Sequence, residues 1–487
     1  MSFIQDHDLG PLASYGVLLE DFTPEKIKNA ESPCKAYKEM KEHWELPLAL
    51  RGGTLKMREG KQKWLPKEPK ESVVAYTNRL ARSVCYGAFN RTVNTLAGLP
   101  FMRPVTTENI PEELGYLKSD CDNTGRDLTS FSNSLLKEML ELGLTHFIVD
   151  MPYFEGDVSI EEEEKYKIRP YFTQISPTNL IRWTTARVGG LTILTSISIK
   201  EEYYVQKNAF EEEEIEQVRV ITPNSIQIWR EDEQSEEWYL HDTIPNELGK
   251  IPLVTVYGDY DGFMQGKPPL EDLAWLNLKH YQQQSDLDHI QHVANVPILF
   301  GQGFDPAEME GVEVGPDRLI IGPENSSLEY VEHTGSAIGS SRESLKALEE
   351  QMAAMGADLI VRKSVDRQTA TARQIDQSES VSMLQLMVNN LESAIEQGIQ
   401  LAAEWAGVEV EDVQVDAGDY LDTPAGPNTI DVLIQYLMES KGITIEDVQT
   451  ELKRRGVLSD VFKIGKRGET PQNQDKGTGG LSQNNIN

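Results

Sequence analysis

The sequence predicts an α+β protein with several structural regions, and three patterns lead to that prediction. Apolar residues recur near a 3.6-residue period over much of the first 143 residues and again after residue 336, which is typical of amphipathic helices. Short apolar runs separated by turns fill residues 168–257, as expected of strands. A helix, a small β insert and a second helix follow in residues 268–357. The chain has 487 residues, which is too long for one simple core.

In the N-terminal part we expect helices over residues 24–49, 70–98 and 127–143. Ser72 stands near the start of the second helix, and Gly143 is a C-terminal stop for the third. A short apolar strand, residues 146–149, comes next. In the β-rich region the predicted strands include Leu191–Ile199, Val218–Thr222, Ser225–Trp229 and Leu253–Tyr257, and the acidic runs Glu161–Glu164 and Glu211–Glu214 are interpreted as solvated loops.

Prolines delimit the next helix, which we expect from just after Pro269 to about Asn295, before Pro297. The insert, residues 296–333, contains three short apolar runs, at 297–300, 318–321 and 328–331. The helix that follows, about 340–357, has one apolar stripe made of Leu345, Leu348, Met352 and Met355.

The C-terminal part is predicted to be helical, with a polar end. After a polar stretch at 360–370, a helix over residues 371–405 would be roughly 50 Å long. Two shorter helices are expected at about 428–440 and 444–455. The tail from about residue 465 is polar and rich in Gly, Gln and Asn, so we expect it to be disordered.

The chain is strongly acidic, with 79 Asp and Glu against 46 Lys and Arg and a formal charge of −33. This is the opposite of the basic surface that binds phosphate backbones tightly. An acidic wall can still surround a duplex and let it slide, because like charges keep it from sticking. Charge that only keeps the protein soluble explains the composition equally well.

The sequence also narrows the cellular setting. No run approaches the roughly 20 apolar residues of a membrane-spanning helix, and the start MSFIQDHDLG lacks the pattern of a signal peptide, so we expect a protein made and kept in the cytosol. Cys34, Cys85 and Cys121 are far apart and show no CxxC spacing, so we expect small buried side chains and neither a disulfide nor a zinc site.

Motifs for common catalytic chemistry are absent from the sequence. It contains no GxxxxGK[ST], HExxH or GxSxG, and no GxGxxG placed between a strand and a helix, so we expect no enzymatic activity and no cofactor. The best candidate for a metal or acid–base site is a group on one predicted helix, made of Asp286, Asp288, His289 and His292. Hydrogen bonds or subunit contacts by the same residues are the simpler interpretation.

One basic cluster stands out in the acidic chain: Arg362, Lys363 and Arg367, in a predicted loop between two helices. It is either a solvated loop or a loop that touches phosphates.

Several segments along residues 35–460 form a specific, ordered set. The most specific are PPLEDLAWLNLKHYQQQSDLDHIQHVANVPILFGQG at 268–303, YVEHTGSAIGSSRESLKALEEQMAAMGADLI at 330–360 and TATARQ at 369–374. The others are WLPKEP at 64–69, ESVVAYTNRL at 71–80, GLTHFIVDMP at 143–152 and RPYFTQISPTNLIRW at 169–183. In this order the segments resemble a tailed-bacteriophage portal family.

The resemblance implies a portal fold with wing, stem helices, a small β clip and a helical crown, in a closed ring of usually twelve subunits. The implied regions are the N-terminal helices and β-rich wing (1–267), stem helix (268–295), clip (296–335), second stem helix (336–357), tunnel loop (358–370), wing spine helix with a return segment (371–425), crown (426–462) and disordered tail (463–487).

By the same resemblance, the ring is a channel at one capsid vertex of the virion, through which double-stranded viral DNA is packaged and ejected. The implied partners are the major capsid protein or a scaffold, the terminase large subunit and a head-tail adaptor protein. The residues placed nearest DNA are Arg362, Lys363, Ser364 and Arg367. Two other functions stay open: a metal-dependent hydrolase that uses Asp286, Asp288, His289 and His292, or another capsid or tail structural protein.

Overall fold

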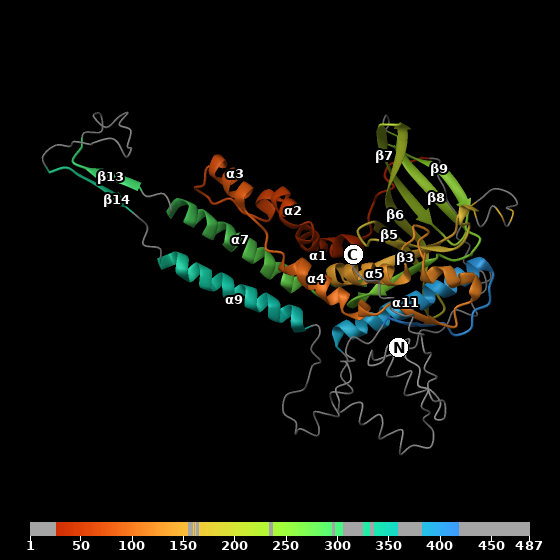
Figure 1. Ribbon diagram of the computed structural model, residues 1–487. Helices are drawn as coiled ribbons and strands as arrows, with labels where there is room; N and C mark the ends of the chain where they lie inside the picture. The colour runs from red at the N-terminus through yellow and green to blue at the C-terminus, as the bar shows by residue number, and fades with distance from the viewer. Residues whose placement is uncertain are drawn as a thin grey trace, which may run out of the picture. The chain divides into compact units, whose positions relative to one another are not determined.

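A computed structural model of the chain describes residues 26–153, 159, 161, 165–232, 237–294, 298–304, 325–331, 336–358 and 382–417. The chain divides into two units, Met1–Gly418 and Asp419–Asn487, and all described residues belong to the first. Helices and antiparallel sheets both contribute to this unit, which confirms the α+β class (Figure 1). The segments predicted as crown helices and as a disordered tail lie outside the described residues.

The N-terminal helices are shorter and more numerous than the sequence predicts. They are α1 (Lys35–Arg51), α2 (Gly53–Glu59), the 3-10 helix η2 (Lys61–Lys63), α3 (Val73–Arg82) and α4 (Ala88–Gly98), after the short strand β1 (Lys26–Ile27). The single helix predicted over 70–98 is wrong, because the backbone is extended at Ser83 (φ −60°, ψ 138°). The guanidinium of Arg58 donates to the Ser83 carbonyl at 2.7 and 2.9 Å and stabilises this break.

Two helices and a small sheet form the central core. The helix α5 (Leu128–Leu142) is confirmed, with Asp127 as N-cap and Gly143 as a left-handed end at φ 86°. It packs with α11 (Met383–Ala406) on one face of a sheet ordered β10 (Leu253–Tyr257), β3 (Leu144–Asp150), β4 (Tyr171–Ile175). Both helices reach Phe147: the Phe131 ring on α5 is 5.7 Å away, and Gly398 on α11 lies against it.

A larger sheet covers the opposite face of this small one. Its order is β1-β9-β8-β7-β6-β5, all antiparallel, with β5 Leu180–Val188, β6 Leu191–Asn208, β7 Glu211–Ile221, β8 Ser225–Asp232 and β9 Glu237–Pro245. Ile148 and Ile175 of the small sheet pack with Ile197, Ile199 and Ile221 of the large one. The acidic run Glu211–Glu214, predicted as a loop, is instead the beginning of strand β7, because it pairs with β6.

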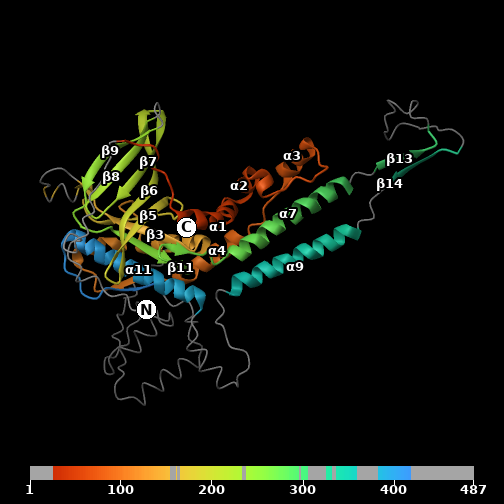
Figure 2. The same cartoon turned by 180° about the vertical axis from the view of Figure 1, so that it is seen from behind.

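The helix, β insert and helix of the sequence prediction are present. They are α7 (Glu271–Ala294), a hairpin of β13 (Ile298–Gln302) with β14 (Ser327–Val331), and α9 (Ser336–Asp358). α7 and α9 lie side by side in both views (Figures 1 and 2). The insert strand predicted at 318–321 lies outside the described residues.

α11 is shorter than predicted. Ser382 has extended backbone, and its side chain accepts a hydrogen bond from the Gln385 amide, so the helix begins at Met383 and not at residue 371. Its 24 residues span about 36 Å, against the roughly 50 Å expected.

The remaining elements are short. They are η3 (Pro100–Met102), β2 (Thr106–Glu108), η4 (Glu112–Lys118), β11 (Tyr260–Gly262), β12 (Gln265–Gly266) and β15 (Gln414–Asp416). None of the described helices has both the length and the apolar character that crossing a membrane requires. The three cysteines are free, and Cys121 is buried as expected, whereas Cys34 and Cys85 are half-buried.

Candidate functional site

The pair of helices α7 and α9 is the candidate site, because the chain passes out along one helix and back along the other. Leu287 of α7 and Leu345, Leu348 and Met352 of α9 are buried. Three of the four residues of the predicted α9 stripe are therefore in the core, and the fourth, Met355, is half-buried. The apolar stripe explains why α9 packs along α7, since most of the stability of a helix in a protein comes from packing its apolar face.

The N-terminal helices hold the first half of α7 in place with polar contacts. The side chain of Asn277 accepts from the Phe89 amide at 2.9 Å and donates to the Tyr86 carbonyl at 2.8 Å. α4 has no side-chain cap of its own, so Asn277 satisfies one of its first amides from another helix. The Tyr281 hydroxyl is 2.7 Å from Ser83 Oγ, at the break between α3 and α4.

A buried ion pair lies beside the second half of α7. Arg79 on α3 donates to both carboxylate oxygens of Glu71 at 3.0 and 2.9 Å, and to the Pro66 carbonyl at 2.7 Å. Both side chains of the pair are at most 8% exposed. Arg79 also reaches Asp286 of α7 at 3.5 Å. The pairing with Arg79 lowers the pKa of Glu71, so this carboxylate stays charged.

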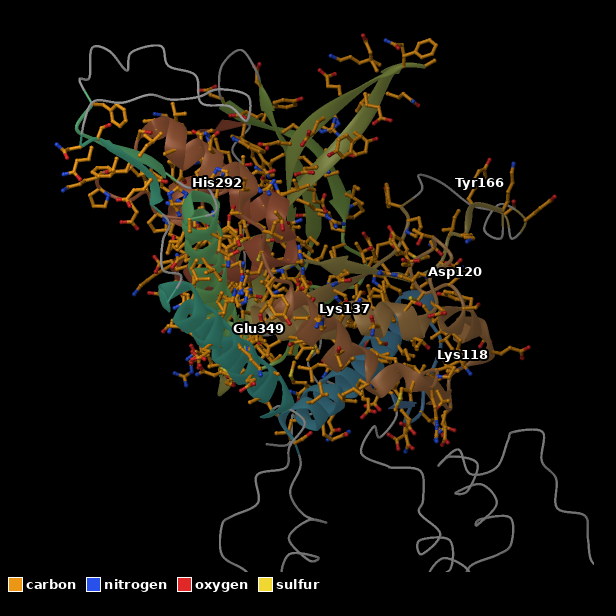
Figure 3. All side chains as sticks on the ribbon, turned by 60° about the vertical axis from the view of Figure 1, so that its left-hand side comes forward. Lys118, Asp120, Lys137, Tyr166, His292 and Glu349 are labelled. Atoms are coloured by element: carbon orange, nitrogen blue, oxygen red, sulfur yellow. The ribbon has the colours of Figure 1, made fainter. Side chains whose placement is uncertain are left out.

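α7 and α9 are also joined by polar side chains. His280 Nε2 lies 3.2 Å from Glu349 Oε1, and the His280 ring lies 5.0 Å from that of Tyr86 (Figure 3 labels Glu349 on α9). In the part of the chain that the structure describes, buried side-chain atoms without a hydrogen-bond partner include four on α7, those of His280 (Nδ1), Gln283 (Oε1), Ser285 (Oγ) and His289 (Nδ1). Each of these atoms has lost water on burial without gaining a hydrogen bond, which lowers the stability of the packing around α7.

The metal or acid–base candidate does not form a metal site in the described residues. Asp286 interacts with Arg79, and Asp288 accepts a 2.7 Å hydrogen bond from Gln284. His292 is exposed near the end of α7 (Figure 3). Among the described residues no group of three or more His, Cys, Asp or Glu side chains could hold a metal ion. The simpler interpretation, side chains in hydrogen bonds and ion pairs, fits Asp286 and Asp288.

The predicted DNA-facing residues Arg362, Lys363, Ser364 and Arg367 lie outside the described residues. The described chain ends at Asp358, the last residue of α9, and resumes at Ser382, the N-cap of α11. The assignment of these four predicted residues to a tunnel loop therefore stays a prediction.

Several residues of the site were missed from the sequence. Asn277, Tyr281 and His280 interrupt the apolar face of α7 and make its long-range contacts. The signal was present, since polar residues among the core positions of a helix require partners elsewhere. The identity of those partners, such as the Phe89 amide 188 residues away in sequence, could not be read from spacing.

Comparison with known proteins gives few matches that carry information. Residues 269–406 match a family model described as "Domain of unknown function (DUF4055)", which is less than half of the chain. No curated protein matches. A chain from the solved structure "Virion of native gene transfer agent (GTA) particle" is similar at 12% identity and a TM-score of 0.40, over 75% of this chain and 89% of that one.

A second similar structure is "Neck of native GTA particle computed with C12 symmetry", at 12% identity and a TM-score of 0.40, over 79% of this chain and 93% of that one. A third, "Neck of empty GTA particle computed with C6 symmetry", has a TM-score of 0.39 at 12% identity, over 75% and 90%. These TM-scores are too low to support an assignment, so the function is argued from the chain's own residues and contacts.

Proposed function

We propose that this chain is the portal subunit of a tailed phage or a phage-like particle. The observation that carries the proposal is the α7, β13–β14 and α9 arrangement, in which two packed helices flank a small β hairpin. It coincides with the part of the sequence that most specifically resembles portals, residues 268–374. In this proposal α7 and α9 are the stem, residues 296–335 the clip and residues 358–370 the tunnel loop.

The proposed activity is mechanical. Subunits form a closed ring, usually of twelve, around a channel for double-stranded DNA during packaging and ejection. The acidic chain keeps the duplex from binding the wall tightly. In each subunit Arg362, Lys363 and Arg367, with Ser364 beside them, make transient phosphate contacts, which centre the duplex without reading its sequence. The ring binds no cofactor and catalyses no reaction.

The proposed location is the portal vertex of the virion. There the clip binds the terminase large subunit during packaging and a head-tail adaptor protein later, while the capsid protein or a scaffold surrounds the ring. Each subunit presents two different faces to its neighbours, as a closed ring with heterologous contacts requires.

The first test is the assembly state of the purified chain, measured by mass determination and negative-stain imaging, alone and with capsid or scaffold protein. We expect rings of about twelve subunits with a central hole about as wide as a duplex. A chain that stays a monomer or small dimer in both preparations would contradict the proposal.

The tunnel-loop assignment has its own test. Replacing Arg362, Lys363 and Arg367 together by Ala should leave ring assembly unchanged but lower DNA packaging or genome retention, because the phosphate contacts are lost. Particles of the triple variant that fill with DNA like the wild type would show that these side chains do not touch the duplex.

A further inference from the structure

The surface around α2 and α3 is basic in an otherwise acidic protein. Residues 51–82 contain nine Lys or Arg and three Asp or Glu, whereas the whole chain contains 46 and 79. Some of these cations have partners, such as Arg79 with Glu71 and Lys63 with Glu45. Lys61, Lys67, Lys70 and Arg82 form no ion pair with any described residue. We call this region, residues 51–84, the basic surface.

The basic surface also exposes large apolar side chains. Val73 and Val74 at the start of α3 are 72% and 71% exposed, and Leu55 on α2 is 73% exposed. Val84 is exposed as well, and it lies near Leu55, because the neighbouring Cys85 amide donates to Thr54 Oγ1 at 3.1 Å. Apolar side chains grouped among unpaired cations are typical of a protein-binding surface.

An acidic surface lies on the ribbon formed by the distal parts of β6 and β7, residues 201–217. Opposite residues of an antiparallel pair point to the same face, and the register pairs Glu202 with Glu216, Tyr204 with Glu214 and Gln206 with Glu212. Glu202 and Glu216 are like charges directly opposite each other, which destabilises a sheet, and Glu212 and Glu214 add two more carboxylates to the same face. This face, the acidic face, therefore gains stability from a cationic partner.

The acidic face has few partners within the chain. Glu216 pairs with Lys200 at 3.1 Å, but Glu202, Glu212 and Glu214 form no ion pair with a described residue. The Tyr204 hydroxyl donates to Glu202, and this hydrogen bond together with the charge of Glu214 raises the pKa of Tyr204.

Large apolar side chains accompany the charges here too. Tyr204 is 55% exposed and Phe210, in the turn of the ribbon, is 96% exposed. The ribbon thus offers carboxylates and aromatic rings, which match the ammonium groups and the aliphatic side chains of the basic surface.

We propose that the basic surface of one subunit binds the acidic face of the β6–β7 ribbon of a second copy of this chain. Within the described residues no ion pair joins the two surfaces. Two different surfaces that bind each other between copies form a head-to-tail contact, which closes into a ring when the rotation allows it. The inference rests on the proposed ring and names one of its subunit contacts.

Charge reversal tests this contact in the full-length chain. One variant carries Lys61→Glu, Lys67→Glu and Lys70→Glu, and the other carries Glu202→Lys, Glu212→Lys and Glu214→Lys. Each variant alone places like charges across the contact, so we expect the assembled fraction measured by mass photometry to fall about tenfold or more. An equal mixture restores opposite charges at every contact of an alternating ring, so assembly should return to near the wild-type level.

The matched controls are Lys118→Glu and Glu113→Lys, both exposed on η4 and away from the two surfaces (Figure 3 labels Lys118). They should assemble like the wild type. Thermal unfolding of each variant checks that it folds. The inference is overturned if the mixture stays unassembled or if either reversal variant assembles normally. Normal assembly of the Glu202→Lys, Glu212→Lys and Glu214→Lys variant is the result expected if residues 1–25, rather than a second copy, cover the basic surface. Wild-type rings with these results would leave the portal proposal intact, whereas a wild type that stays monomeric both alone and with capsid or scaffold protein would remove both.

Discussion

The buried side chain of Arg79 connects α3, the loop before it and α7. It donates two hydrogen bonds to Glu71 and a third to the Pro66 carbonyl, and it approaches Asp286 of α7. The sequence places Arg79 in a helix but gives no indication that its side chain is buried, since Arg is ordinarily exposed. The partners come from the loop before α3 and from a helix about 200 residues later, and only the tertiary structure brings them together.

The first prediction concerns this ion pair. Arg79→Met leaves the buried carboxylate of Glu71 without its cation, so the free energy of unfolding should fall by about 3 kcal/mol in a urea titration. Arg82→Met, on the exposed face of the same helix, is the control and should change it by less than about 0.5 kcal/mol. Equal stability of the two variants would mean that the pair contributes nothing to the fold.

The second prediction concerns pH. Burial of His146 in the central sheet lowers its pKa from 6.5 to about 3. Between these two pH values the imidazole of His146 stays neutral in the folded chain but binds a proton in the unfolded chain. The free energy of unfolding therefore falls as the pH falls below 6.5. The loss should approach about 1.4 kcal/mol per pH unit, and His146→Gln should remove this part of the slope.

The free energy of unfolding measured between pH 7.5 and about pH 5.5 checks this prediction. The control is His241→Gln, at an exposed position, which should keep the wild-type dependence of stability on pH. An unchanged slope in His146→Gln would show that this side chain takes up a proton in the folded chain too.

Among the elements, prediction from the sequence succeeded where the ends are set locally. α5 begins after Asp127 and ends at Gly143, both of which are standard signals at their positions. The break at Ser83 and the late start of α11 were missed. The break at Ser83 depends on the Arg58 side chain from α2. The start of α11 depends on Ser382 being its N-cap, and the sequence upstream contains other Ser and Thr residues that could have had this role.

The third prediction concerns the contact of α11 with the central sheet. A Cβ added at Gly398 would lie 2.6 Å from the Phe147 ring and 3.3 Å from that of Phe172. Gly398→Ala should therefore destabilise the chain by about 1–3 kcal/mol, although Ala favours a helix. Thermal unfolding of both variants measures this change. The control is Gly98→Ala at the end of α4, where an added Cβ meets nothing within 4 Å, and it should be neutral or stabilising. A stabilising Gly398→Ala would mean that the helix does not pack this closely.

For the whole molecule, the sequence predicted the α+β class and the order of helix, β insert and helix. Periodicity and proline positions were sufficient for that order, because they act locally. The sequence could not predict which polar residues of α7 bind the N-terminal helices. Nor could it predict that Glu211–Glu214 pairs into a sheet, because strand pairing overrides the preference of acidic runs for loops. The assignment of Arg362, Lys363, Ser364 and Arg367 to a DNA channel rests on the resemblance and on position in the sequence.

A consequence at this scale is that assembly should depend on salt. If the basic surface and the acidic face bind each other, exposed charges contribute to the contact, and these are screened once the Debye length falls below about 10 Å. Rings should therefore dissociate more readily at high salt in the wild type, as measured by sedimentation velocity. Salt-independent assembly would indicate a contact dominated by apolar side chains.

The measurement that tests the central claim most directly is cryo-electron microscopy of the particle assembled from the purified chain. We predict a closed ring with a central channel wide enough for a duplex, α7 and α9 along that channel, and the proposed tunnel loop, residues 358–370, facing its axis. A ring without a channel of that width, or one with α7 and α9 on its outer surface, would contradict the claim that this chain forms a conduit for DNA.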